Sequence, residues 1–60
     1  MKARVGDVFY SEYFLNWCQI LEILPDKYFI FKTNGKTLKS HIKTTYLEEG
    51  NYIFRRVTKK

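Results

Sequence analysis

The chain has 60 residues, of which 45% are hydrophobic and 18% aromatic, and its formal net charge is +5. A chain this short builds one core, so we expect a single domain, residues 1–60, without a buried catalytic cleft of ordinary size. The hydrophobic content, with one Pro and three Gly, excludes a disordered chain. No apolar run approaches the ~20 residues that span a membrane, so we expect no membrane partner.

The charge is divided unevenly along the chain. Residues 1–26 contain two basic and four acidic residues, a net charge of −2, whereas residues 27–60 contain nine basic and two acidic residues, a net charge of +7. This division indicates an acidic partner, either nucleic acid or an acidic protein surface. The competing interpretation is a solvated basic face that keeps the protein in solution.

The first elements in chain order are a short strand and an ambiguous segment. Val8-Phe9-Tyr10, after Gly6-Asp7, predicts the first strand. Residues 17–23 are rich in aromatic and branched side chains, as in a strand. Residues 12–24 also fit a helix, capped by Ser11 and stopped by Pro25, with a polar stripe of Glu12, Asn16, Gln19 and Glu22. We favour the strand; the alternative is an α+β fold with a helix at about 12–24 on a small antiparallel sheet.

Asn34-Gly35 is the clearest local signal, because Asn-Gly favours a two-residue type I′ turn. This turn sets the pairs Thr33–Lys36, Phe31–Leu38, Phe29–Ser40 and Tyr28–His41. Side chains alternate along strands, so the hairpin has a core face of Phe29, Phe31, Thr33, Leu38, Ser40 and Ile42. The other face is wet and basic: Tyr28, Ile30, Lys32, Thr37, Lys39, His41 and Lys43.

The C-terminal third predicts a helical turn and a last strand. Thr45 and Glu48 have the spacing of a capping box, and Gly50 can end the turn in a left-handed conformation. Residues 51–57 read as a strand with Ile53 and Val57 inward, and Phe54 then needs a bulge or burial on both sides. Residues 57–60 are expected to be a frayed basic tail.

Two motifs carry a resemblance: Gly6-Asp7-Val8-Phe9-Tyr10-Ser11 and, after a short loop, Trp17-x-Gln19-Ile20-x-Glu22-Ile23. They resemble the opening of small SH3-like β-barrels, several of which are carried by phages and mobile elements. The resemblance implies an all-β fold, a small five-stranded SH3-like barrel with one short helical (3-10) turn before the last strand. It implies binding but no ligand, because such barrels bind proteins, RNA and DNA. Tyr10, Tyr13 and Trp17 supply rings for an SH3-type groove, but that motif has no residue-by-residue match.

Side chains for catalysis or metal binding are few. Cys18 lies in an apolar segment and is expected to be a small buried hydrophobe, whereas His41 lies on the wet face. One Cys and one His fall short of a structural zinc site, and the three glycines are isolated. We therefore expect no enzyme, no cofactor, no metal and no small-molecule substrate. The lone Cys and the absence of an apolar leader predict a cytoplasmic protein.

The predicted partner-binding site combines the basic hairpin face with two C-terminal arginines: Tyr28, Ile30, Lys32, Lys39, His41, Lys43, Arg55 and Arg56. Cations neutralise phosphates and exposed rings stack on bases. The leading hypothesis is a non-enzymatic module that binds nucleic acid, or a nucleic-acid-associated complex, through the basic face of the 28–43 hairpin. The alternative is a protein–protein interaction module, such as a phage-type adaptor or an inhibitor of a host protein. A homo-oligomer that buries surplus aromatic rings is a third interpretation.

Overall fold

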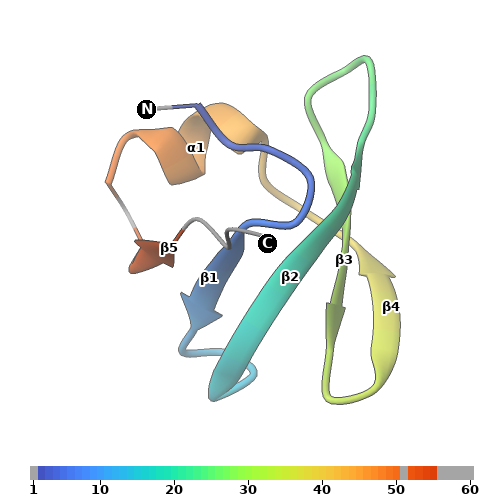
Figure 1. Cartoon of the computed structure of the whole chain (residues 1–60), viewed down its shortest axis with the longest axis vertical. Helices are drawn as coiled ribbons and strands as arrows, with labels where there is room; N and C mark the ends of the chain where they lie inside the picture. The colour runs from blue at the N-terminus through green and yellow to red at the C-terminus, as the bar shows by residue number, and fades with distance from the viewer. Residues whose placement is uncertain (1, 51, 56–60) are drawn as a thin grey trace, which may run out of the picture.

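The computed structural model describes residues 2–50 and 52–55. They form one antiparallel sheet and one short helix (Figure 1). The elements in chain order are β1 (Val8–Ser11), β2 (Asn16–Ile23), β3 (Phe29–Thr33), β4 (Lys36–Lys39), α1 (Thr44–Glu48) and β5 (Phe54–Arg55). The strand order is β4-β3-β2-β1-β5. The predicted small, mostly β fold is confirmed, and the described strands form an open sheet with β4 and β5 at its two edges.

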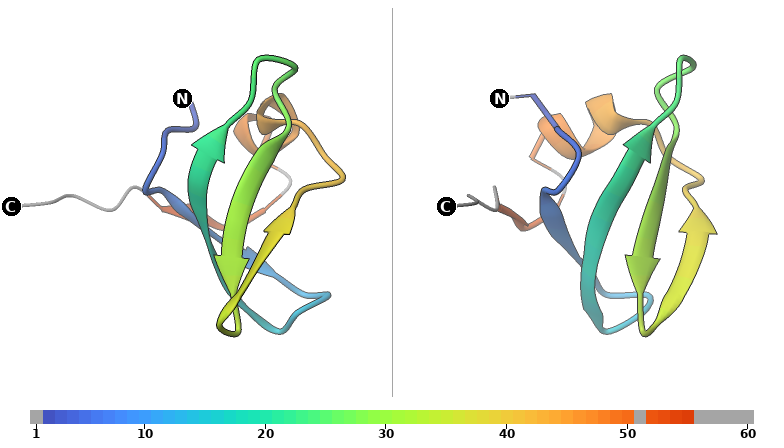
Figure 2. Two further views of the ribbon diagram at one scale, coloured as in Figure 1. Left: turned by 90° about the vertical axis from the view of Figure 1, so that its right-hand side faces the viewer. Right: turned by 45° about the vertical axis from the view of Figure 1, so that its right-hand side comes forward.

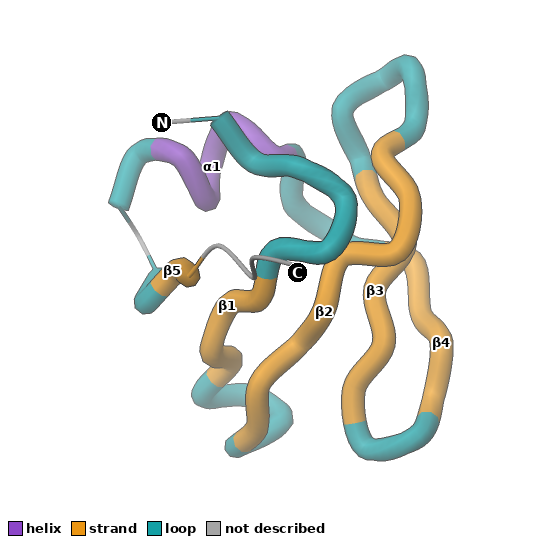
Figure 3. The backbone as a smooth tube through the Cα atoms, in the orientation of Figure 1, coloured by secondary structure: helices purple, strands orange, loops and turns teal. Residues whose placement is uncertain are grey.

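Strand β2 replaces the helix that the alternative placed at about 12–24, and that alternative is wrong. Residues 12–15 form a turn, and β2 then pairs with β1 on one side and β3 on the other. The pairing with β3 shifts between Ile20 and Glu22, and Figure 3 shows the β2 backbone bending towards its C-terminal end. A bulge inserts one residue and changes the alternation. The bulge places Gln19 and Glu22 on the same side of β2 although they are three residues apart. Their spacing in the sequence therefore resembles that of a helix.

The hairpin forms as predicted at its turn. Asn34 and Gly35 have φ values of 52° and 75°, as a type I′ turn requires, and Thr33 pairs with Lys36 and Phe31 with Leu38. The Ser40 N–H donates to the Phe29 carbonyl at 2.8 Å, while the Phe29 N–H donates to Ser40 Oγ at 3.0 Å. The Ser40 hydroxyl thus takes the place of a backbone carbonyl as the acceptor for Phe29, and the chain leaves the sheet at Ser40. The predicted pairing of Tyr28 with His41 does not form.

The core lies on one face of the sheet, between the strands and α1. The ring of Phe9 contacts Phe29 and Phe31 edge-on, at centroid distances of 5.7 and 5.8 Å. Leu47 brings α1 into this cluster, which also contains Cys18 and Ile20. On the predicted core face of the hairpin, Phe29, Phe31, Thr33 and Ser40 are buried, and Leu38 and Ile42 are half-buried. The predicted division of the hairpin into two faces is confirmed.

The helical segment differs in detail from the predicted capping box. The helix α1 is an α-helix capped by Lys43, without a side-chain hydrogen bond at the cap, so Thr45 is an internal residue. Glu48 instead reaches the N-terminal segment, where its Oε2 accepts a hydrogen bond from the Ala3 N–H at 2.6 Å. Gly50 has a φ of +87°, as predicted. The capping-box prediction failed because Glu48 bonds to Ala3, which is distant in sequence, and a local motif cannot indicate such a partner.

The last strand begins later than predicted, at Phe54, because residues 52 and 53 are not part of it. Residue Arg55 pairs with Val8, and Ile53 has the same parity as Arg55. Ile53 is 62% exposed, so its predicted inward position is wrong. Its carbonyl still accepts the Tyr10 N–H at 2.9 Å, which ties this segment to β1. The predictions for Arg56, Val57 and the tail 57–60 lie outside the described residues.

Candidate nucleic-acid interface

One row of paired residues crosses all five strands on the side of the sheet away from the core. The pairs link, in order, Arg55, Val8, Gln19, Lys32 and Thr37. Directly paired residues project to the same side of a sheet, so Arg55 and Lys32 share one face although they come from distant parts of the chain. In the left view of Figure 2, α1 lies behind the upper parts of β2 and β3, and the near side of β2, β3 and β4 is uncovered.

We call this side the outer face. It is made of side chains from all five strands together with Tyr28 and Lys43 from the flanking loops: Val8, Tyr10, Trp17, Gln19, Glu22, Tyr28, Ile30, Lys32, Thr37, Lys39, Lys43 and Arg55.

An aromatic cluster with one cation occupies the β1–β5 side of the outer face. The guanidinium carbon of Arg55 lies 5.3 Å from the centroid of the Trp17 ring. Tyr10, which pairs with Trp17, meets that ring edge-on at 5.5 Å. Trp17 remains 38% exposed. A cation over an indole face is a favourable contact, and it fixes a partly exposed ring beside a positive charge.

A second cluster occupies the β3–β4 side of the outer face. The Nζ atoms of Lys39 and Lys43 lie 5.8 and 5.7 Å from the centroid of the Tyr28 ring. Ile30 pairs with Lys39 and is half-buried. His41 is exposed and lies at the margin, where it lines a shallow pocket with Asp26, Tyr28 and Lys39. Two lysines around one tyrosine again place positive charge beside an aromatic ring.

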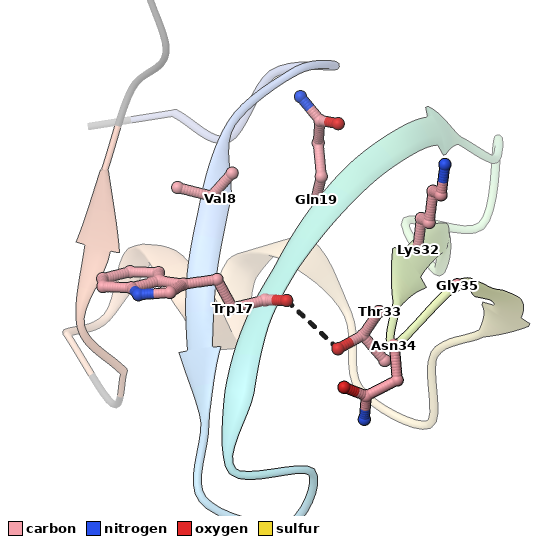
Figure 4. Close-up of a pocket in the computed structure, with 7 residues that line it drawn as sticks. All are labelled: Val8, Trp17, Gln19, Lys32, Thr33, Asn34 and Gly35. Atoms are coloured by element: carbon pink, nitrogen blue, oxygen red, sulfur yellow. Dashed lines mark hydrogen bonds between the residues drawn. The ribbon is translucent and has the colours of Figure 1, made fainter.

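A shallow pocket of about 340 Å³ lies beside Trp17, between β1 and the β3–β4 turn (Figure 4). Gln19 and Lys32 rise from β2 and β3, on the side of the sheet opposite α1, and the Trp17 ring extends across β1 (Figure 4). Two hydrogen bonds link residues around the pocket: Thr33 Oγ1 donates to the Trp17 carbonyl at 3.1 Å, and Asn16 Nδ2 donates to Asn34 Oδ1 at 2.5 Å. The Gln19 amide nitrogen donates to the Gly6 carbonyl at 3.2 Å. The pocket therefore has an ordered polar rim.

The charge of the outer face is predominantly positive. Lys32, Lys39, Lys43 and Arg55 are all exposed. Glu22 pairs with Ile30 and lies on the same face, so the face has four cations and one carboxylate. This balance, with three rings, suits an anionic ligand that also has flat apolar groups.

The structure brings together most of the predicted site. Tyr28, Ile30, Lys32, Lys39 and Lys43 share the outer face, and Arg55 joins them from β5. His41 lies at the margin, and Arg56 is outside the described residues. Tyr10 and Trp17 were absent from the predicted site. Only the register between β1 and β2 places them there, and no turn motif in residues 12–15 encodes that register.

Cys18 and His41 do not form a nucleophile pair, because Cys18 is fully buried and His41 is exposed. In the ranges 2–50 and 52–55, no three His, Cys, Asp or Glu side chains come close enough to hold a metal ion. Within the same ranges, no helix is long and apolar enough to cross a membrane.

Burial raises the pKa of the Cys18 thiol above its ordinary value of 9.0, and a hydrogen bond with Thr33 offsets part of that increase. The folded protein thus keeps the thiol protonated at a pH where the unfolded chain ionises it. This contribution to stability is fully present below pH 9.0 and is lost as the pH rises through the folded pKa. Urea unfolding below and above pH 9.0 should show a steeper alkaline loss of stability for the wild type than for Cys18→Ala. The two proteins differ only at residue 18, so equal pH dependence would contradict the buried thiol.

Comparisons with known proteins found no matching family model, no similar curated protein and no similar solved structure. The geometry of the outer face is therefore the basis for assigning a function.

Proposed function

We propose that the protein is a non-enzymatic binding module that holds single-stranded nucleic acid across the outer face. The observation that carries the proposal is the position of two cation–ring clusters on one uncovered side of the sheet. These clusters are Arg55–Trp17–Tyr10 and Lys39–Lys43–Tyr28, and Lys32 lies on β3, between the β1–β5 and β4 sides. Cations take phosphates, and exposed rings stack on bases.

A single strand fits this face better than a duplex. Stacking on Trp17 or Tyr28 needs a base with a free face, and bases within a duplex already stack on each other. The side chains that could contact base edges, Gln19 and Asn34, line the shallow pocket beside Trp17. They are polar but few, so we expect weak sequence preference.

We propose that the strands curl into an SH3-like barrel, which is supported by the order β4-β3-β2-β1-β5 and by the helix between β4 and β5. A cytoplasmic location accords with the fully buried, unpaired thiol of Cys18, because thiols stay reduced there.

Charge reversal on the outer face tests the proposal. Lys32→Glu with Lys39→Glu should strongly weaken the binding of a fluorescent oligo-dT at low salt, measured by anisotropy. It should also reduce the log–log salt slope by about 0.7 for each lysine that contacts a phosphate of a single strand. Both side chains are exposed, so circular dichroism and thermal unfolding should stay close to those of the wild type.

The matched control is Lys27→Glu with Lys36→Glu, which makes the same change in net charge at two exposed lysines. Lys27 lies in the β2–β3 loop, and Lys36 pairs with Thr33 on the opposite side of the hairpin from Lys39. The control should retain most of the affinity. Equal loss in both double variants would mean that net charge alone attracts the oligonucleotide, and no binding at low salt would reject the proposed function.

A further inference from the structure

A second binding surface lies on the core side of the sheet and borders the outer face at β4, where the core opens between the β1–β2 loop and that strand. A cleft of about 500 Å³ has the rings of Phe9, Phe29 and Phe31 along its floor. Tyr13 and Phe14 form one wall, and residues 38–42 form the other. The floor rings are nearly fully buried, whereas Tyr13 is 88% exposed and Phe14, Leu38 and Ile42 are half-buried. An apolar side chain of a binding partner could therefore enter the cleft and contact the core rings.

The wall formed by β4 is also an edge of the sheet. In the described part of the chain, β4 pairs only with β3. The pairs Thr33–Lys36 and Phe31–Leu38 occupy the hydrogen-bonded positions next to a two-residue turn, and the Ser40 N–H bond to Phe29 continues that phase. Thr37 and Lys39 therefore direct their N–H and C=O groups away from β3. These groups flank Leu38, so a free backbone edge borders the cleft.

The charge around this edge is positive. Lys36 and Lys39 are exposed along β4, and the sequence from Lys27 to Leu47 contains no Asp or Glu. Asp26 lines a shallow pocket with Lys39 and His41, so two lysines and one carboxylate lie near this edge. On the opposite wall, Glu12 lines a neighbouring pocket with Tyr46 rather than this cleft. An occupant with carboxylates is therefore favoured over a neutral or basic one.

We propose that the cleft and the β4 edge together bind an extended acidic segment of a partner protein, which adds a strand to the sheet. Strand side chains alternate. Apolar residues of the segment would enter the cleft beside Leu38, and the intervening Asp or Glu residues would lie beside Lys39. Backbone pairing supplies affinity in this mode, and alternating side chains supply specificity. The proposal does not depend on nucleic-acid binding.

A second copy of the chain fits this edge poorly. Pairing two β4 edges would bring the lysines of both copies together, and like charges on neighbouring strands destabilise a sheet. Edge lysines commonly prevent such edge-to-edge association. The same lysines attract a segment of opposite charge.

The test uses the whole chain and a short fluorescent peptide in which Asp or Glu alternates with Ile or Phe. Thr37→Pro removes one outward N–H without breaking a hydrogen bond to β3, and proline is tolerated at such edge positions. It should weaken peptide binding about tenfold or more, because a backbone bond is lost and the ring blocks close approach. The matched control, Thr37→Val, keeps the N–H and should bind as the wild type does. Amide exchange of Thr37 and Lys39 should slow when the peptide is bound.

A second variant keeps the test decisive if Thr37→Pro fails to fold. Tyr13→Ala removes an exposed wall of the cleft and should weaken the acidic peptide several-fold, with little effect on stability. A peptide with Lys in place of the acidic residues should not bind. Oligo-dT binding should be the same in Tyr13→Ala as in the wild type, because Tyr13 lies outside the outer face, and this separates the two sites.

Three results would overturn the proposal. In the first, the acidic peptide does not bind the folded wild type. In the second, the peptide binds the folded Thr37→Pro and Tyr13→Ala variants as tightly as it binds the wild type. In the third, sedimentation without peptide would show a dimer that Thr37→Pro disperses, which would make a second copy the occupant.

Discussion

Replacing Phe29 with alanine is expected to leave much of the protein unfolded in the absence of denaturant. Phe29 has no exposed surface, and its ring packs against Phe9 at 5.7 Å and Phe31 at 6.0 Å between centroids. Truncating a buried Phe to Ala costs about 3–5 kcal/mol. Stabilities of about 0.05–0.15 kcal/mol per residue give a chain of this length only about 3–9 kcal/mol in total. Urea unfolding followed by circular dichroism measures the loss.

Two controls define what the Phe29 result means. Phe29→Leu keeps most of the apolar volume and should lose clearly less stability than Phe29→Ala. Tyr13→Ala removes a ring that is 88% exposed and should change the free energy of unfolding by no more than about 0.5 kcal/mol. If Phe29→Ala and Tyr13→Ala were equally stable, Phe29 would not be in the core.

Replacing Trp17 with alanine is expected to produce the largest single-residue loss of oligonucleotide affinity. Stacking of a base on an aromatic side chain contributes about 1–3 kcal/mol, which corresponds to roughly fivefold to more than a hundredfold in Kd. The substitution also removes the ring that holds the Arg55 guanidinium at 5.3 Å. Trp17 is the only tryptophan, so its fluorescence in the wild type should be quenched when oligo-dT binds.

The Trp17→Phe variant distinguishes stacking from a general effect on the fold. It keeps an aromatic face and should recover most of the affinity that Trp17→Ala loses. Tyr13→Ala serves as the control for an exposed ring away from the outer face. Unchanged affinity in a folded Trp17→Ala variant would contradict the aromatic part of the site.

The sequence predicts best where structure is determined locally. Asn34-Gly35 specifies its own turn conformation, and the turn then sets the register of the whole hairpin. The basic half of the outer face follows from that register alone. The predicted positions of Lys32 and Lys39 are therefore correct.

Structure determined by distant contacts was predicted less well. Glu48 looked like a capping residue, but its carboxylate accepts a bond from Ala3, which no local pattern encodes. The aromatic half of the outer face depends on the pairing of Tyr10 with Trp17 and of Val8 with Arg55. The turn at 12–15 carries no motif that fixes this pairing, so the contact between Arg55 and Trp17 could not be foreseen.

The helical interpretation of residues 12–24 failed for a related reason. A single bulge between Ile20 and Glu22 changes which side of β2 its side chains occupy, so polar residues recur at helical spacing in a strand. The short turn before β2 and its two neighbouring strands determine its conformation more strongly than this spacing does.

The salt dependence of oligo-dT binding to the wild type measures whether a single strand binds the outer face through its phosphates. The outer face presents four cations, Lys32, Lys39, Lys43 and Arg55, and each phosphate contact with a single strand contributes about −0.7 to the slope of log affinity against log salt. A strand held by phosphate contacts to these cations and by stacking on Trp17 should give a slope of about −2 to −3 and should quench the fluorescence of Trp17. A slope near zero, or a steep slope with unchanged Trp17 fluorescence, would contradict a combined phosphate and base contact at this face.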